Sequence, residues 1–194
     1  MSVETVETKK RIIEAASLAM IAKSYNGVGL NEILQAADVP KGSFYHFFKS
    51  KENLGIAVIE KAAADHFQIV RSYFSDRART PLERLRKYCE SVRDEAAANR
   101  AEQCVVCKLA LEQANLSEPM RAAIRCSFDQ SRSMTAQLLR EAQAAGEVSK
   151  EYDAEQLADF LMVSLDGAMI GAEVNGDVKS IDNFLRFMFG VVLK

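Results

Sequence analysis

Apolar residues recur every three or four positions along almost the whole chain, which is the period of a helix. The first such stripe consists of Ile12, Ile13, Ala16 and Met20. We expect its helix to begin near residues 5–8 and to end before Gly27. No segment alternates with the two-residue period of a strand, and no repeat of 20–50 residues is visible. The pattern predicts an all-α protein of about nine helices.

Capping signals locate several of the later helices. Thr80, Pro81 and Glu83 form a capping box, in which the Thr80 hydroxyl and the Glu83 carboxylate each accept a backbone amide of the other residue. Asp153 and Gln156 resemble a second box, while Gly146 and Gly176 are stop signals. The further helices are expected at about residues 31–37, 40–47, 50–74, 80–98, 104–115, 117–146, 153–174 and 180–192.

Composition narrows the class of protein. The 194 residues include only 3 Pro and 9 Gly, too few for a turn-rich β fold, and the net charge of −2 excludes a general coat for nucleic acid. Four cysteines make no disulfide framework, and no apolar run reaches the roughly 20 residues of a membrane span, so we predict a cytoplasmic protein. The sequence has no Gly-rich phosphate loop, metal-ligand cluster or nucleophile with a base. We therefore expect no enzyme, no cofactor and no metal.

Two short helices, residues 31–37 and 40–47, are joined by Asp38 and Val39, which is helix-turn-helix spacing. Ile33, Leu34, Ala37, Val39 and Phe44 can pack this unit on the first helix. The polar residues left on the outer side are Lys41, Ser43, Tyr45 and His46, beside the bare backbone of Gly42. These side chains suit phosphates and base edges, and Lys51 is placed for a further phosphate. An ordinary αα-corner with a solvated face, and a packed surface role for His46, are the alternatives.

The run Ala36-Ala-Asp-Val-Pro-Lys-Gly-Ser-Phe-Tyr-His-Phe-Phe-Lys-Ser-Lys51 resembles the DNA-binding domain of TetR-family transcriptional regulators. The resemblance implies a homodimeric repressor of a near-palindromic operator. Lys41, Ser43, Tyr45 and His46 would then lie on the recognition helix, with Lys51 contacting the DNA backbone. Asp38 stands where the family usually has Gly, at a turn position that often needs a positive φ.

The resemblance also implies two domains, with residues 1–50 binding DNA and residues 51–194 sensing a ligand and dimerising. A helical protein-interaction module without DNA binding is the alternative function. Gly167 and Gly171 are four residues apart, so small residues would let two helices approach closely. We expect the last two helices, residues 153–175 and 180–192, to form the dimer interface, as in the family. Core packing within one chain is the alternative.

The segment Cys104-Val-Val-Cys107 can be interpreted in three ways, as a zinc site, as plain apolar packing or as a reactive thiol. A helix N-terminus at Cys104, with Arg100 and Lys108 nearby, would lower the pKa of its thiol. The segment also resembles a TetR branch whose cysteine reacts with electrophiles and oxidants. Gln103 replaces the usual Gly of that branch, and Cys107 is an additional thiol. We therefore hypothesise reversible modification of Cys104, with Cys107 as a resolving partner.

Release by non-covalent binding of a small molecule is the rival hypothesis. An apolar pocket among the long middle helices would hold such an inducer. Its candidate lining residues are Phe67, Tyr88, Leu111 and Phe128, which are equally good ordinary core.

Overall fold

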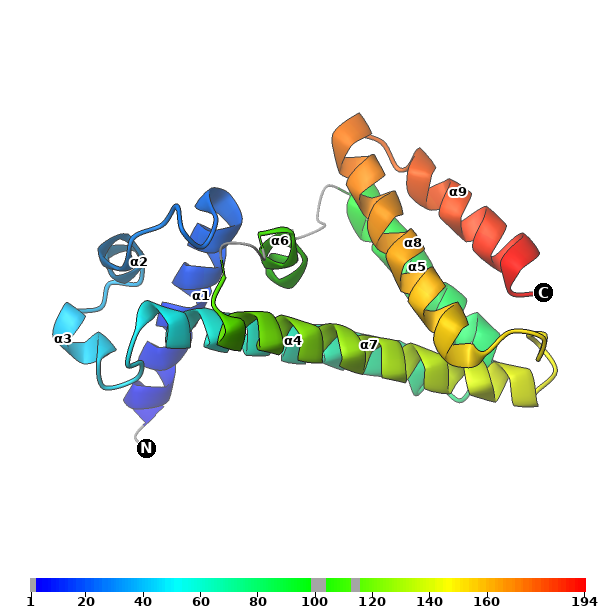
Figure 1. Ribbon diagram of the computed structural model, residues 1–194, viewed down its shortest axis with the longest axis horizontal. Coiled ribbons are helices and arrows are strands. Elements are labelled where there is room, and N and C mark those ends of the chain that lie inside the picture. Colours follow the sequence, from blue (N-terminus) through cyan, green and yellow to red (C-terminus); the bar gives the residue numbers. More distant parts are fainter. Residues whose placement is uncertain (1–2, 99–103, 113–115) are drawn as a thin grey trace. The chain divides into compact units, whose positions relative to one another are not determined.

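The computed structural model describes residues 3–98, 104–112 and 116–194, and all regular secondary structure in this part of the chain is helical (Figure 1). Its elements are α1 (Val3–Lys23), α2 (Leu30–Ala36), α3 (Lys41–Phe44), α4 (Lys51–Phe74), α5 (Pro81–Ala97), α6 (Val105–Leu111), α7 (Glu118–Ala144), α8 (Ala154–Asn175), α9 (Lys179–Phe187) and the π-helical η2 (Met188–Val192). The predicted all-α class is therefore confirmed. No helix within these ranges is long and apolar enough to cross a membrane.

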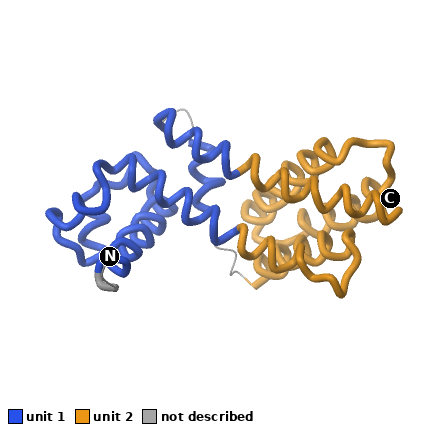
Figure 2. Tube along the Cα trace, turned by 90° about the horizontal axis from the view of Figure 1, so that it is seen from below, with its two compact units in different colours: residues 1–66, 103–127 blue, residues 67–102, 128–194 orange. Residues whose placement is uncertain are grey.

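The chain divides into two compact units (Figure 2). Unit 1 comprises residues 1–66 and 103–127, and unit 2 comprises residues 67–102 and 128–194. Unit 1 thus includes α6 and the first turns of α7 together with α1 to α3 and the part of α4 up to residue 66. The domain boundary expected after residue 50 stays a prediction.

Unit 1 encloses a small apolar core under α2 and α3. The side chains that share it include Ile12, Ala16, Met20, Ile33, Leu34, Ala37, Val39, Phe44 and Leu54, all of them buried. The turn between α2 and α3 contains Asp38 with φ 52°, which confirms the positive φ expected at this position. The guanidinium of Arg11 on α1 donates to the carbonyl oxygen of Asp38 at 3.4 Å, so α1 supports the turn.

The second helix of the helix-turn-helix is shorter than predicted. We expected residues 40–47, but α3 ends at Phe44 and residues 45–47 form a turn. The reason is a tightened last turn, since the amides of His46 and Phe47 donate three residues back, to Ser43 and Phe44. Tyr45 and His46 therefore follow α3 instead of lying within it.

Unit 2 packs α5, α7, α8 and α9 around one apolar cluster. Its fully or nearly buried members include Leu85, Cys89, Leu139, Ala158, Leu161, Ile181 and Met188. The predicted capping box of α5 is present, and the Asp153 carboxylate caps α8 by accepting from the amides of Glu155 and Gln156. Both caps fix where a helix enters this cluster.

Two other predicted helices differ from the structure. The helix expected at 104–115 is present over Val105–Leu111, and the predicted end at Asn115 lies outside the described residues. The last helix widens from α to π at Met188, where the amide of Leu193 donates five residues back. Gly190, a weak helix former, lies inside this widened turn.

Candidate DNA-binding surface, dimer seam and cysteines

Phe44 fixes α3 in unit 1. Its ring is fully buried and lies 5.2 Å from the Tyr45 ring, edge to face, and 5.5 Å from the Phe48 ring. The Lys9 ammonium lies 5.8 Å from the centre of the Phe48 ring, which links α1 to the same cluster. One aromatic anchor therefore decides which side of α3 faces outward.

The predicted DNA-contacting residues lie on that outward side. Lys41, Gly42, Tyr45 and His46 are exposed, and Ser43 is half-buried. A Cβ added to Gly42 would meet no atom within 4 Å, so the backbone there is open to an approaching molecule. The arrangement offers a cationic group, two hydroxyls, an imidazole and bare backbone on one short surface, a set of donors suited to phosphates and base edges.

Lys51 has a different setting. Its ammonium donates to the carbonyl oxygens of Tyr25 at 2.5 Å and of Val28 at 2.6 Å, and lies 4.5 Å from the centre of the Tyr25 ring. Partial burial lowers the pKa of Lys51 below its ordinary value. An ammonium has three donors. Lys51 therefore ties the start of α4 to the loop between α1 and α2 with two of them.

Helix α8 has two apolar faces. Opposite its buried face lies an exposed stripe at heptad spacing, made of Phe160, Val163, Gly167, Ile170 and Val174. On α9 and η2, Phe187 and Val191 are 53% and 66% exposed, far more than apolar residues of a core. We call these seven residues the seam. The sequence predicts a dimer surface on these two helices that includes Gly167, and this stays a prediction. The other residues of the stripe on α8 follow the same spacing of three and four residues.

The two glycines of α8 differ. A Cβ added to Gly167 would meet nothing within 4 Å, whereas one added to Gly171 would lie 3.1 Å from Cβ of Ser180. The Ser180 hydroxyl donates to the carbonyl oxygen of Ala168 at 2.6 Å. Gly171 therefore permits close packing of α8 on the start of α9 within one chain, and only Gly167 is open to a partner.

The four cysteines divide by exposure. Cys104 is the exposed N-cap residue of α6, Cys107 is half-buried, and Cys126 on α7 is exposed. Cys89 is buried in unit 2, where burial raises the pKa of its thiol to about 12. Plain core packing, one of the readings of the Cys104–Cys107 pair, is wrong for Cys104. Arg100 and Gln103, which the reactive-thiol reading used, lie outside the described residues.

The candidate inducer-lining residues do not form one group. Leu111 is 80% exposed on α6 in unit 1, so its predicted burial is wrong, while Phe67 is buried. Tyr88 packs edge to face on Phe74, at 5.8 Å between ring centres.

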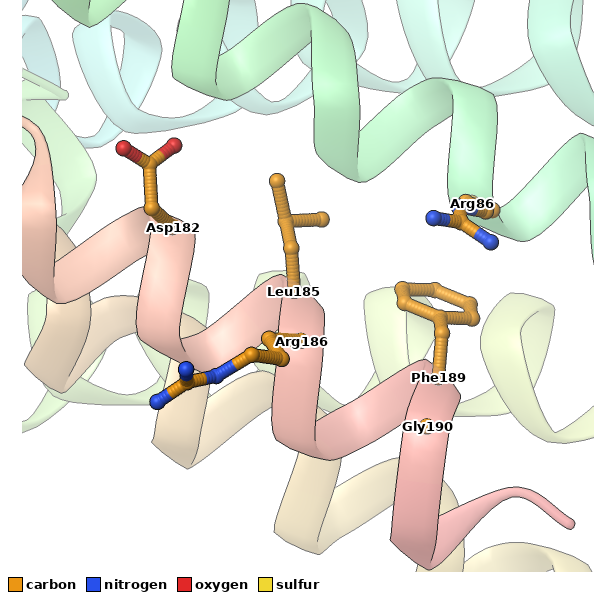
Figure 3. Close-up of a pocket in the computed structure, with 6 residues that line it drawn as sticks. All are labelled: Arg86, Asp182, Leu185, Arg186, Phe189 and Gly190. Atoms are coloured by element: carbon orange, nitrogen blue, oxygen red, sulfur yellow. The ribbon is translucent and has the colours of Figure 1, made fainter.

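Unit 2 carries a surface groove of about 340 Å³ between α5 and α9 (Figure 3). Arg86, Asp182, Leu185, Arg186, Phe189 and Gly190 line it. Arg86 is already paired with Glu90 at 3.0 Å, and it also lies over the Phe189 ring. The groove therefore defines no single class of ligand.

A helix-turn-helix with outward donors, joined to a helical unit with an exposed apolar seam, is the arrangement of a helical DNA-binding regulator. Comparison with known families agrees. The family described as bacterial regulatory proteins, tetR family, matches residues 12–58, and the one described as tetracyclin repressor-like, C-terminal domain, matches residues 81–188. The chain belongs to the TetR family. It is thus a DNA-binding transcriptional regulator of the repressor type, for which the family implies operator binding and dimerisation, and it is not an enzyme.

Individual relatives agree with this family. The chain is 35% identical to the transcriptional regulator AcuR of Cereibacter sphaeroides over 90% of its own length and 80% of the relative's. It is 30% identical to the transcriptional repressor NemR of Escherichia coli over 61% of this chain and 60% of NemR. A crystal structure of a regulatory protein TetR from Rhodobacter sphaeroides superposes with a TM-score of 0.84 at 34% identity, covering 93% of this chain and 96% of that one.

Proposed function

We propose that this regulator binds a near-palindromic operator as a homodimer and is released by chemical change at Cys104. The observation that carries the DNA-binding part is the outward surface of α3 above the buried Phe44. We assign phosphate contacts to Lys41 and Tyr45, base-edge contacts to Ser43 and His46, and close approach of the DNA backbone to Gly42. The protein would act in the cytoplasm, where its DNA lies.

Lys51 has a more limited role in this proposal. Two of its donors go to the carbonyl oxygens of Tyr25 and Val28, so only the third can serve a phosphate. We therefore propose that Lys51 contributes to DNA binding chiefly by holding the loop that leads into α2.

The seam supports a homodimer formed by the last two helices. Its exposed apolar side chains on α8, α9 and η2 would cost free energy in water, and a second copy of the same surface would cover them. Gly167 in the middle of the stripe lets the two copies of α8 approach closely. This is the interface we expected at residues 153–175 and 180–192.

Cys104 and Cys107 are the proposed sensor. They lie three positions apart at the first turn of α6, and Cys104 is open to solvent. A hydroperoxide would oxidise the Cys104 thiolate to a sulfenic acid and leave as an alcohol or water. The Cys107 thiolate would then attack that sulfur, forming a disulfide and releasing water, so that the pair loses two electrons in all. An unsaturated carbonyl would instead form a carbon–sulfur bond and take up the proton at its α-carbon.

The relatives give this proposal its direction. One solved structure with the same fold is described as the reduced form of E. coli NemR, and that description applies to NemR alone. Binding of a small molecule without covalent reaction is the second candidate for release. The groove between α5 and α9 is the cavity in which such a molecule would bind.

The DNA-binding proposal is tested by titrating wild-type, K41A and Y45A protein into a fluorescent duplex that the wild-type protein has selected from a random library. Each variant should bind at least about tenfold more weakly, because each loses one phosphate contact in each protomer, and K41A should lower the salt slope by about two, one for each copy of Lys41. K61A is the matched control, since Lys61 pairs with Asp65 on the exposed side of α4. Unchanged affinity of both variants would remove these roles.

The sensor proposal is tested by treating the protein–DNA complex with N-ethylmaleimide, a quinone or a hydroperoxide. Wild-type protein should leave the duplex, and C104S should stay bound. C126S is the matched control, because Cys126 is also exposed in unit 1. Release of C104S at the wild-type rate would contradict the sensor assignment.

A further inference from the structure

The end of α1 is held by a side-chain clip from α6. In a continuing α-helix, the amide of Tyr25 would donate to the carbonyl oxygen of Ile21, four residues back. Instead, the Lys108 ammonium donates to the Ile21 oxygen, and the Tyr25 amide donates to the Glu112 carboxylate at 3.2 Å. Two side chains one turn apart on α6 thus satisfy both halves of one missing backbone hydrogen bond.

The loop that follows is strained and held from a second side. Ser24 has φ 72°, a left-handed conformation that is unfavourable for a residue with a Cβ. At Gly27, an added Cβ would lie 1.9 Å from the carbonyl oxygen of Lys23, so only glycine fits where the chain folds back. Lys51 on α4 takes the Tyr25 and Val28 carbonyl oxygens. Strain of this kind persists only where the surroundings enforce it.

The clip also lies next to the proposed sensor. The amide of Lys108 donates to the carbonyl oxygen of Cys104 at 2.9 Å, which is the first helical hydrogen bond of α6. Lys108 and Glu112 are half-buried, and the buried residues Val105, Val106 and Leu109 hold the rest of α6 in unit 1. A change in the first turn of α6 therefore reaches the clip without crossing any other element.

We infer that Lys108 and Glu112 are positioning residues for DNA binding, which keep α1 from extending and so set the direction in which the chain enters α2. When α6 moves away from the end of α1, the Tyr25 amide can donate to the Ile21 carbonyl oxygen, and Ser24 returns to the helical conformation. The helices α2 and α3 then lose their orientation. The positioning role rests on DNA binding by α3. The link to Cys104 rests on the proposed sensor as well.

The main test uses protein in which Cys104 and Cys107 are both serine, so that its outcome does not depend on thiol chemistry. K108M and E112M should each bind the selected duplex roughly tenfold more weakly, because each loses one hydrogen bond made by a charged group. K108R and E112Q keep a donor or an acceptor and should stay within about threefold of the parent. K61M is the matched control on α4. Equal affinity of all variants would overturn the inference.

A second measurement separates positioning from mere folding. Ser24→Gly and Ser24→Ala both remove the hydroxyl that accepts from the Gly27 amide, so they differ in their tolerance of a positive φ. S24G should bind the duplex roughly tenfold more tightly than S24A. Equal binding by the two variants, at unchanged helix content, would contradict the inference.

Hydrogen exchange tests the clip without any DNA. The Tyr25 amide should be protected in the parent protein. It should exchange faster in E112M, where Lys108 still occupies the Ile21 carbonyl oxygen and leaves the amide without an acceptor, but not in E112Q. If the duplex fails to bind even wild-type protein, the DNA-binding proposal fails, and this exchange still decides whether the clip exists. Equal exchange in E112M and the parent would show that Glu112 does not hold the Tyr25 amide.

Discussion

Both units have an apolar core, and charged side chains join the helices of each unit in different ways. In unit 2, α5, α7, α8 and α9 share one apolar cluster, and charged pairs such as Arg93 with Asp182 join side chain to side chain across helices. In unit 1, Arg11 and Lys51 donate to backbone oxygens of two loops, and Lys108 donates to the backbone oxygen of Ile21 in the last turn of α1. In unit 2, Arg84 also makes a contact of this kind, to the backbone oxygen of Phe74. The buried area of an apolar cluster contributes to the stability of the fold, whereas a hydrogen bond to one backbone atom fixes the direction of the chain at that point.

This difference separates two kinds of effect. A change in the cluster of unit 2 should alter stability or assembly and leave the folded regulator's affinity for DNA nearly unchanged. A change in the loop contacts of unit 1 should alter that affinity at little cost in stability. The variants below test the separation, beginning with the largest expected effect.

Ile170→Asp in the seam should abolish dimerisation. It places a carboxylate in the proposed apolar interface, at a cost of about 3–5 kcal/mol, or more than about hundredfold in the dimer constant. Operator binding should fall with it, because a palindrome requires two copies. Sedimentation measures the dimer, and Tyr152→Asp is the control, since Tyr152 is 55% exposed and Ile170 is 52% exposed. A fully dimeric I170D would show that the seam is not the interface.

Leu161→Ala should lower the free energy of unfolding by about 2–5 kcal/mol, because Leu161 is only 2% exposed within the cluster of unit 2. Urea unfolding measures the loss. The folded L161A protein should still bind the duplex within about threefold of wild type, which K108M should not. If L161A loses DNA affinity in proportion to its stability, the separation between the units does not hold.

The helices themselves could be predicted because their signals are local. The capping box at Thr80 and Glu83 and the cap at Asp153 each involve residues no more than three positions apart. The positive φ of Asp38 followed from the family pattern of one turn. In α3, the helix period alone could not show that hydrogen bonding tightens after Phe44.

Neither the clip nor the choice of which face of α8 points outward could be predicted from the sequence, for physical reasons. Lys108 and Ile21 are 87 positions apart, and a bond from a side chain to a backbone oxygen leaves no residue pattern at the acceptor. Helix α8 is apolar on opposite faces, so periodicity cannot say which face is core. Leu111 was misplaced because a helix of only 7 residues shows too few turns to define a face.

The two glycines of α8 should respond oppositely to alanine. G171A adds a Cβ 3.1 Å from Ser180, and displacing Ser180 should cost about 1 kcal/mol of unfolding free energy net of helix propensity. G167A meets no atom within the chain, so it should stabilise the protomer by up to about 1 kcal/mol while weakening the dimer. Thermal unfolding and sedimentation of the same samples measure both. A G167A protein with an unchanged dimer constant would place Gly167 outside the interface.

Asp38→Gly tests the strained turn of unit 1 and should have the smallest effect. Glycine adopts φ 52° freely, so D38G should be more stable than wild type by about 0.5–1 kcal/mol. The contact from Arg11 goes to the backbone oxygen of residue 38, and it survives the substitution. Asp38→Asn is the matched control, because asparagine also tolerates a positive φ but has no charge. Thermal unfolding of the three proteins should show D38G above D38N, with D38N close to wild type. If D38N gains as much stability as D38G, the carboxylate of Asp38, and not its backbone conformation, is what destabilises this turn.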